Sequence, residues 1–283
     1  MLPTYRRQRM TTPDSRAIAR LNELRHAHIG SIYGDESETI GGGRVSFSAG
    51  SPWFCRAAGL GYEGPVTGED LDRIVEYFRS RGVEPKVEIP VFAPKELLDG
   101  LADRGFGVRQ FENVYARAIL PGEDVRLALP YGWPEGLVVN TLDPSDDSAV
   151  REYVLTVLRG FMPAEAVKDE MIESTLRTMT RESIVGFVGR IGGHIAGLGA
   201  LEWFEIEGRR LCALAGAVTV EAFRGRGVQL SLIAHRLNAA RDLGCSLALI
   251  ESFPGIPTER NAARVGFSLA YARAVLTADA KPS

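Results

Sequence analysis

A strand followed by a glycine- and arginine-rich turn and then a helix most strongly limits what this chain can fold into. Residues 218 to 230 read VTVEAFRGRGVQL, and apolar residues then recur at helical spacing through residue 237. Such a turn aims several backbone N–H groups and the positive end of a helix at one point, which suits a pyrophosphate. Arg224 and Arg226 add donors for charge-assisted bonds to phosphate oxygens.

Spacing separates this turn from two common nucleotide-binding motifs. A P-loop needs Gly-Lys followed by Ser or Thr, and Val228, Gln229 and Leu230 stand there instead. The dinucleotide pattern Gly-x-Gly-x-x-Gly needs a glycine where Leu230 stands, and the βαβ unit around it is missing. The turn therefore fits neither motif.

The same segment resembles the GNAT superfamily, the acyl-CoA-dependent N-acyltransferases. The signature of that family is Gln/Arg-x-x-Gly-x-Gly/Ala at a strand-to-helix turn, and residues 224 to 229 read RGRGVQ. The match is at Arg224 and Gly227, with Gln229 in place of the final small residue. The resemblance covers about residues 137 to 280, and it implies acetyl-CoA as the cosubstrate.

The resemblance also assigns residues to that cosubstrate. In the family, the strand before the turn splays from its neighbour and holds the pantetheine arm, which implies this role for Val218, Thr219 and Val220. A backbone N–H near Val220 is the implied donor to the oxyanion. Asn261, on the last short helix, is a further candidate for the pantetheine. The implied phosphate ligands are Arg224, Gly225, Arg226, Gly227, Val228 and Gln229.

Transfer from a thioester to an amine needs a base, an oxyanion donor and an acid. Glu251 ends the buried run LALI near the implied splay, and desolvation there is expected to raise its pKa. The alternative interpretation is that Glu251 pairs with an arginine such as Arg260. Glu202, on another strand leading to the site, is the competing base. Trp203 and Phe204 beside it are candidates for the acceptor pocket or for the core.

The usual acid of the family is absent from its usual place. Ala262 stands at the tyrosine position of the family, and Gly255 stands at its asparagine position. Tyr271 is a possible replacement, although its counterpart Tyr115 in the first half argues for a structural role. Water can also protonate a thiolate, so the missing tyrosine does not exclude turnover.

The chain is expected to consist of two related halves. Turn-forming residues are densest at residues 121 to 134, which places a divergent domain at residues 1–128 and the cofactor-binding domain at residues 129–283. Gly-Phe followed by Tyr-Ala-Arg occurs at residues 105 to 117 and again at residues 266 to 273, which indicates duplication. The expected fold is α/β, of the α+β type: two GNAT-like domains in tandem, each a mostly antiparallel sheet flanked by helices. CoA is expected only in the second half.

Local patterns place the other elements. Thr12, Pro13 and Asp14 are expected to begin the first helix, and Thr67 begins a second with capping-box spacing. Gly192 and Gly193 are expected to join two strands in a hairpin. The other expected strands lie at residues 43–48, 53–58, 86–91, 108–119, 210–220 and 246–253, with a last strand from residue 267. The other expected helices lie from residue 94, at residues 143–161, from residue 163, at residues 227–243 and around residue 261.

Composition excludes several classes of function. With 45% hydrophobic residues, 24% charged residues and a net charge of -3, the chain resembles an ordinary globular protein and offers no extended surface for nucleic acid or anionic lipid. Cys55, Cys212 and Cys245 lack CxxC spacing, and the 4 histidines form no set with carboxylates, so no disulfide or metal site is expected. No apolar run suits a membrane helix or a signal peptide.

Together these features predict a complete cytoplasmic N-acetyltransferase. Its cosubstrate is acetyl-CoA, and its acceptor is a primary amine of a small molecule or peptide. The alternative is a CoA-binding or CoA-sensing protein without turnover.

Overall fold

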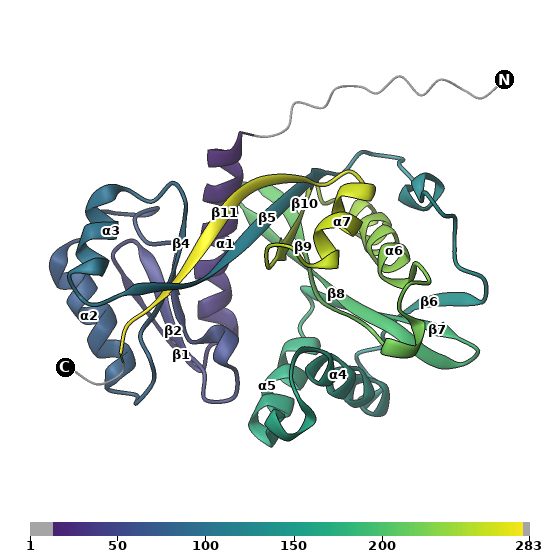
Figure 1. The fold of residues 1–283 in the computed structure, drawn as a ribbon, viewed down its shortest axis with the longest axis horizontal. Coiled ribbons are helices and arrows are strands. Elements are labelled where there is room, and N and C mark those ends of the chain that lie inside the picture. The colour runs from purple at the N-terminus through teal and green to yellow at the C-terminus, as the bar shows by residue number, and fades with distance from the viewer. Residues whose placement is uncertain (1–13, 280–283) are drawn as a thin grey trace.

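The computed structural model describes residues 14–279 (Figure 1). Thr12 and Pro13 lie outside this range, and the carboxylate of Asp14 accepts a hydrogen bond from the Arg16 N–H at the start of the first helix. Thr67 begins the second helix with the predicted capping box, completed by Asp70. The helices are α1 (Ser15–Tyr33), α2 (Gly68–Arg79), α3 (Lys95–Ala102), α4 (Asp147–Phe161), α5 (Asp169–Met179), α6 (Val228–Asp242) and α7 (Pro257–Arg264). Short 3-10 turns are η1 (Pro52–Phe54), η2 (Val125–Ala128), η3 (Ala164–Ala166) and η4 (Glu221–Phe223).

The described strands form one continuous sheet in the order β1-β2-β3-β4-β11-β5-β10-β9-β8-β7-β6. Two of them, β1 and β6, were not expected from the sequence. Both lie at the edges of the sheet, where polar residues alternate poorly with apolar ones and the pattern that marks a strand is weak. The strands are β1 (Glu36–Ile40), β2 (Gly43–Phe47), β3 (Arg56–Ala58), β4 (Lys86–Pro90), β5 (Gly107–Ala118), β6 (Leu137–Thr141), β7 (Ile184–Ile191), β8 (His194–Ile206), β9 (Arg209–Thr219), β10 (Leu247–Ser252) and β11 (Ser268–Thr277).

The two halves of the chain exchange their last strands. β11, from the end of the chain, lies between β4 and β5, and β5, from the first half, lies between β11 and β10. Figure 1 shows these two long strands side by side, running from one half to the other. The exchange joins what could have been two sheets into one, so each half contributes backbone to the core of the other. The division at residues 128 and 129 remains a prediction about the sequence.

Two pairs of strands are parallel, and each is joined through a helix. β3 pairs with β4 across α2, and β9 pairs with β10 across α6. The pairing of β9 with β10 is short: it begins at Leu211 and Leu247 and ends at Ala213 and Leu249. β9 then continues to Thr219 along β8 alone. The predicted splay between two central strands is therefore present.

Different helices cover the two faces of the sheet around this splay. Leu247 and Leu249 pack with Ile18 and Leu21 of α1 on one face. Ala248 and Ile250 pack on the other face against an apolar cluster that includes residues of α6 and α7. A helix of the first half thus packs on one face of β9 and β10 where the splay begins.

Candidate functional site: the splay and the turn before α6

The turn before α6 leaves its backbone N–H groups unused. Gly225 and Gly227 have left-handed φ values of 76° and 80°, a conformation that glycine adopts at little cost. Gly227 caps α6 without any side-chain hydrogen bond. Among the described residues, no backbone or side-chain acceptor receives the N–H groups of residues 225 to 230. Several unpaired donors and the positive end of a 15-residue helix therefore meet at this turn.

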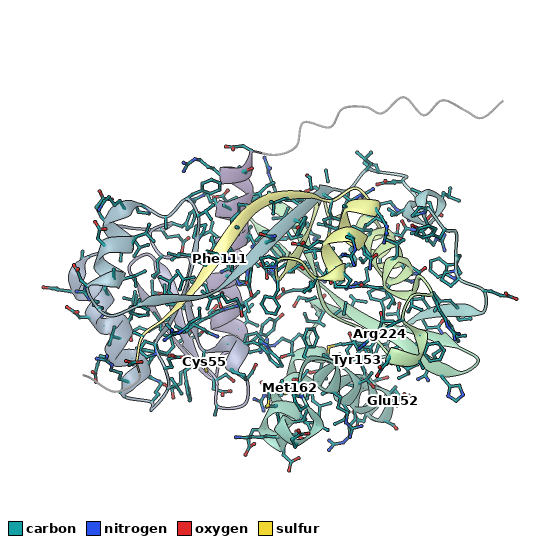
Figure 2. The ribbon with its side chains drawn as sticks, in the orientation of Figure 1. Cys55, Phe111, Glu152, Tyr153, Met162 and Arg224 are labelled. Atoms are coloured by element: carbon teal, nitrogen blue, oxygen red, sulfur yellow. The ribbon has the colours of Figure 1, made fainter. Side chains whose placement is uncertain are left out.

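The side chains of the turn favour an anion as well. Arg224 and Arg226 are exposed, and neither forms an ion pair with the part of the chain that the structure describes. The Arg226 guanidinium lies over the Phe223 ring, 5.5 Å from its centre. The first turn of α6 contains no acidic residue. In Figure 2, Arg224 lies on the second half, away from α2 and α3.

The edge of β9 that faces the splay has free polar groups. The Val220 N–H donates to the Ala196 carbonyl at 3.0 Å, so it is not free to serve as the oxyanion donor that the resemblance implied. Because backbone groups alternate in direction along a strand, those of Thr219 point to the opposite edge, toward the gap beside β10. The Thr219 Oγ1 atom is buried without a hydrogen-bond partner among the described residues. Val218 packs with α4 on the same segment.

Gln229 and Asn261 contact each other. The Asn261 Nδ2 group donates to Gln229 Oε1 at 2.6 Å, and Gln229 Nε2 donates to Thr258 Oγ1 at 3.1 Å. The long side chain at the last signature position is thereby directed onto α7. The structure brings these two predicted residues together beside the turn, and their roles toward a ligand remain predictions.

In the first half, the corresponding loop before α2 has its N–H groups bound within the protein. The loop between β3 and α2 donates its Gly61 and Glu63 N–H groups to the carbonyls of Gly41 and Gly42. At the start of α2, the Thr67 hydroxyl accepts the Asp70 N–H, and the first turn is acidic. Used donors and negative charge both disfavour a phosphate. The starts of α2 and α6 thus differ in their free donors and charge, and the expectation of one phosphate-binding turn stays a prediction.

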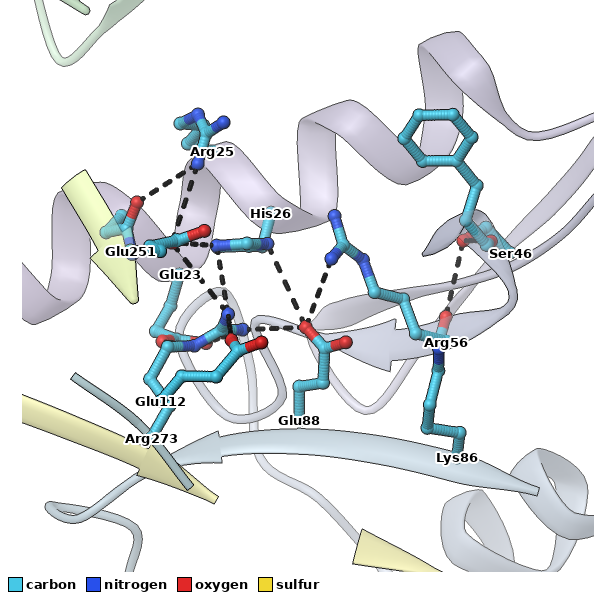
Figure 3. Close-up of polar contacts among 12 residues, drawn as sticks. Glu23, Arg25, His26, Ser46, Arg56, Lys86, Glu88, Glu112, Glu251 and Arg273 are labelled. Carbon is cyan, nitrogen blue, oxygen red and sulfur yellow. Dashed lines mark hydrogen bonds and ion pairs between the residues drawn. The ribbon is translucent and has the colours of Figure 1, made fainter. Parts of the chain in front are cut away.

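Glu251 lies at the splay, but not as a free carboxylate. Its Oε1 atom accepts one hydrogen bond from Asn22 and contacts His26, while Arg25 lies 3.6 Å away (Figure 3). Its Oε2 atom receives no hydrogen bond from the described residues, and the side chain is 25% exposed. Burial opposes ionisation, but His26 and the charges of Arg25 and Arg273 outweigh it and hold the pKa of Glu251 well below its ordinary value. The expected rise of this pKa is therefore wrong.

The other two catalytic candidates are fully engaged. Glu202 is buried, with Oε2 bound by Arg25 at 2.5 and 3.0 Å and Oε1 bound by the Tyr33 hydroxyl at 2.9 Å. The Tyr271 hydroxyl donates to Glu23 and accepts from Asn22, both at 2.9 Å. Burial raises the pKa of Tyr271 well above its ordinary value. Of the three candidates, only Glu251 keeps a free oxygen.

The two aromatic residues beside Glu202 lie on opposite faces of the sheet. Phe204 is buried in the cluster beneath α1. Trp203 packs with the α6 cluster, and its ring N–H donates to the Glu182 carbonyl at 3.2 Å. Both positions are accounted for by packing.

Helix α1 and the sheet enclose a group of charged side chains, hereafter the charge cluster (Figure 3). Burial and Arg273 lower the pKa of His26 to about 3, so its ring is neutral at pH 7. The cluster contains two more carboxyl groups than guanidinium groups. Its members are Glu23, Arg25, His26, Arg56, Glu88, Glu112, Glu202, Glu251 and Arg273.

Glu112 is a member that the sequence did not single out. It lies on β5 opposite Arg273 of β11, with 3.5 Å between Arg273 Nη1 and Glu112 Oε2 and a side chain that is 22% exposed. Burial and the charge of Glu251 raise its pKa to about 7. Two neighbouring carboxyl groups with pKa values displaced in opposite directions are typical of sites that hold and move protons.

Replacing Glu112 with glutamine should stabilise the protein at pH 8. The pKa of this carboxyl group is about 7 in the folded protein and about 4.5 in the unfolded chain. The folded protein therefore loses stability as the pH rises from 4.5 to 7, and the whole loss is present above pH 7. Urea unfolding should show a gain of about 1–3 kcal/mol for Glu112→Gln at pH 8 and almost none at pH 4.5.

Glu88→Gln is the matched control, with the opposite sign. Burial raises the pKa of Glu88, but Arg56 and Arg273 more than offset it and hold the value at about 2. Its ionised form therefore stabilises the fold above pH 4.5, and the glutamine variant should be less stable at pH 8. A loss of stability in Glu112→Gln at pH 8 would refute the assignment of a raised pKa to Glu112.

Comparison with solved structures identifies known proteins that share this fold. No family model and no curated protein matches the sequence. Solved structures do match: a GCN5-related N-acetyltransferase from Kribbella flavida has a TM-score of 0.64 at 16% identity, covering 95% of this chain and 96% of that one. A tandem GNAT protein from the clavulanic acid biosynthesis pathway has a TM-score of 0.59 at 16% identity, covering 91% and 88%. A putative GNAT-family acetyltransferase from Novosphingobium aromaticivorans has 0.54 at 17%, covering 92% and 99%.

The chain therefore has the GNAT fold, with the GNAT-like units in tandem, and the fold class expected from the sequence is confirmed. Among residues 14–279, no helix combines the length and the apolar character required to span a membrane. The same residues contain no group of three or more His, Cys, Asp or Glu side chains arranged to hold a metal ion.

Proposed function

We propose that this protein is an N-acyltransferase that uses acetyl-CoA, or a close acyl-CoA, and acts on a primary amine. The observation that carries the proposal is the splay between β9 and β10, which leads directly into a helix start with unused N–H groups. The three similar structures named above are described as a GCN5-related N-acetyltransferase, a tandem GNAT protein and a putative GNAT-family acetyltransferase, and these descriptions support the same reaction class.

The residues of the second half suit each part of the cosubstrate. The turn at residues 224 to 229 would hold the pyrophosphate through N–H groups and two arginines. The free edge of β9 at Thr219, next to Val218, would hold the pantetheine arm, and the Thr219 hydroxyl would gain a partner. The bound thioester supplies an activated acyl group. Asn261, through its contact with Gln229, would fix the position of α7 beside the arm.

Glu251 is the group best placed to receive the amine. Its free Oε2 atom and partial exposure at the splay allow it to hold an ammonium ion. Its low pKa makes it a weak base, so Glu112, with a pKa of about 7, is the member of the pair suited to take the proton near neutral pH. The amine nitrogen forms a bond to the thioester carbonyl carbon, the C–S bond breaks, and the sulfur leaves with its electron pair. One proton from the ammonium goes to the carboxylates and then to solvent, and another ends on the thiol.

The first half completes this site without forming a second one. It contributes α1, which binds Glu202 and Glu251, and β5, which carries Glu112. Its own turn before α2 is closed and acidic. The three free cysteines suit a reducing compartment, and we place the enzyme in the cytoplasm on that basis.

The experiment is a thiol-release assay with acetyl-CoA and a panel of primary amines, with mass spectrometry of the products. The proposal predicts amine-dependent release of one thiol per acetylated amine. Glu251→Gln should lower kcat/KM for the amine at least tenfold, because the ammonium loses its counter-charge. Glu205→Gln, at an exposed ion pair with Arg210, is the control and should behave like the wild type. Acetyl-CoA binding without transfer to any amine would instead favour a sensing protein.

A further inference from the structure

Arg236 is a buried charge without a counter-ion. It lies on α6, its exposed fraction is 1%, and no carboxylate of the described residues lies within ion-pair distance. Burial lowers its pKa to about 10, so it remains a cation at neutral pH. Buried arginines are almost always paired, because the desolvation of an unpaired charge is costly. Its retention here needs a reason other than an ion pair.

The guanidinium group of Arg236 donates its hydrogen bonds to backbone carbonyls of α6, β8 and β9. Nη1 donates to the carbonyls of Ala200 and Ala215, at 2.9 and 3.3 Å, and Nε donates to the Leu232 carbonyl at 3.1 Å. Ala200 and Ala215 are paired residues of β8 and β9, and the register of these strands shifts next to them, between residues 198 and 200. Arg236 therefore satisfies carbonyls at a β-bulge.

Two glycines make this arrangement possible. A Cβ atom at Gly199 would lie 2.9 Å from Arg236 Cζ, so only glycine leaves space for the guanidinium. Gly216 has a left-handed φ of 59°, which allows β9 to bend at the bulge. Gly216 comes three residues after Ala213, the last β9 residue paired with β10. The bulge that Arg236 supports thus coincides with the start of the splay.

We infer that Arg236 is a positioning residue of the acyl-transfer site: it fixes the β9 bulge that opens the splay, and its unpaired charge stabilises the negative charge that transfer develops there. The inference rests on the proposed function. A fixed cation in a site shielded from water acts strongly on developing charge and needs no rearrangement during the reaction. The Tyr153 hydroxyl, on α4, is buried without a hydrogen-bond partner among the described residues; burial raises its pKa, and the charge of Arg236 acts in the opposite direction.

Three variants separate the charge from the support of the bulge. Arg236→Lys keeps the charge, Arg236→Gln keeps hydrogen-bond donors without charge, and Gly199→Ala keeps the arginine but displaces it. Arg241→Met is the control, since Arg241 lies on the same helix with partners Asp242 and Glu123, away from the bulge. The measurements are acetyl-CoA affinity by calorimetry, kcat and KM in the thiol-release assay, and amide hydrogen exchange of residues 215 to 219 without ligand.

The expected order of kcat is wild type and Arg241→Met, then Arg236→Lys, then Arg236→Gln. The glutamine variant should lose a factor on the order of 10–100 in kcat, with the dissociation constant of acetyl-CoA changed less than about fivefold. Gly199→Ala should speed amide exchange at the bulge and lower kcat while the arginine is retained.

Equal kcat in folded Arg236→Gln and Arg236→Lys would overturn the role of the charge. Unchanged amide exchange at the bulge in all three variants would overturn the positioning role. If Arg236→Gln fails to fold, the lysine and Gly199→Ala variants decide the question by the same readouts. An inactive wild type would reject the proposed function and this inference together, whereas an active wild type with unaffected variants would reject the inference alone.

Discussion

Replacing Gly225 with aspartate is expected to weaken acetyl-CoA binding about 100-fold or more while leaving the fold intact. Gly225 has a φ of 76°, and nothing lies within 4 Å of the Cβ position, so the side chain fits and the backbone strain is about 1 kcal/mol. The new carboxylate would stand among the free N–H groups at the start of α6. Repulsion of about 1–4 kcal/mol for each nearby charge pair is enough for this loss. Calorimetry and the thermal shift with acetyl-CoA measure it.

Gly61→Asp is the matched control for strain. Gly61 has a φ of 82° and lies in the loop before α2, the corresponding turn of the first half. Its substitution should lower stability by a similar amount and leave acetyl-CoA affinity unchanged. If Gly225→Asp binds acetyl-CoA as tightly as the wild type, the phosphate site is not at this turn.

Replacing Arg273 with methionine is expected to cost about 3–5 kcal/mol of the free energy of unfolding. Its side chain has no exposed surface, and it donates to Glu23 at 2.7 Å and to Glu88 at 3.0 Å. Without Arg273, the carboxylates of Glu23 and Glu88 remain buried and lose a positive charge that offsets their desolvation. Because β11 lies between β4 and β5, the loss should affect both halves in one transition. Urea unfolding followed by tryptophan fluorescence and circular dichroism measures this.

Arg117→Met offers a matched comparison. Arg117 is the counterpart of Arg273 in the internal repeat, but its ion pair is with Glu123 alone and is partly exposed. Its replacement should cost about 1 kcal/mol or less. If Arg273→Met does not fold, Arg273→Lys should still show a measurable loss, and Arg273→Met with Glu23→Gln should recover part of it. A loss below 1 kcal/mol in Arg273→Met would show that the charge cluster does not hold the halves together.

Local signals in the sequence were sufficient for the part of the site made by contiguous residues. The strand, the glycine turn and the helix at residues 209 to 242 lie where the pattern predicts them, because glycine conformation and helical spacing are local properties. The capping box at Thr67 and the hairpin at Gly192 were predictable for the same reason.

The composite part of the site depends on the strand exchange, which no local pattern encodes. Glu112 is near Glu251 only because β5 lies between β10 and β11, and Arg273 reaches Glu88 only because β11 joins the first half. The direction of the pKa of Glu251 depends on Arg25 and His26 of a helix more than 200 residues away in the chain, so burial of its own strand could not predict it. Glu112 follows a run of exposed residues in β5, and its position in the sequence did not mark it as a site residue.

Isothermal titration of the wild-type protein with acetyl-CoA tests the central claim most directly. The turn before α6 has N–H groups that no acceptor of the described residues receives, and two exposed arginines, while the turn before α2 is closed by its own hydrogen bonds and acidic residues. The predicted result is one acetyl-CoA bound per chain. Binding of two molecules per chain, or no binding at all, would contradict the account.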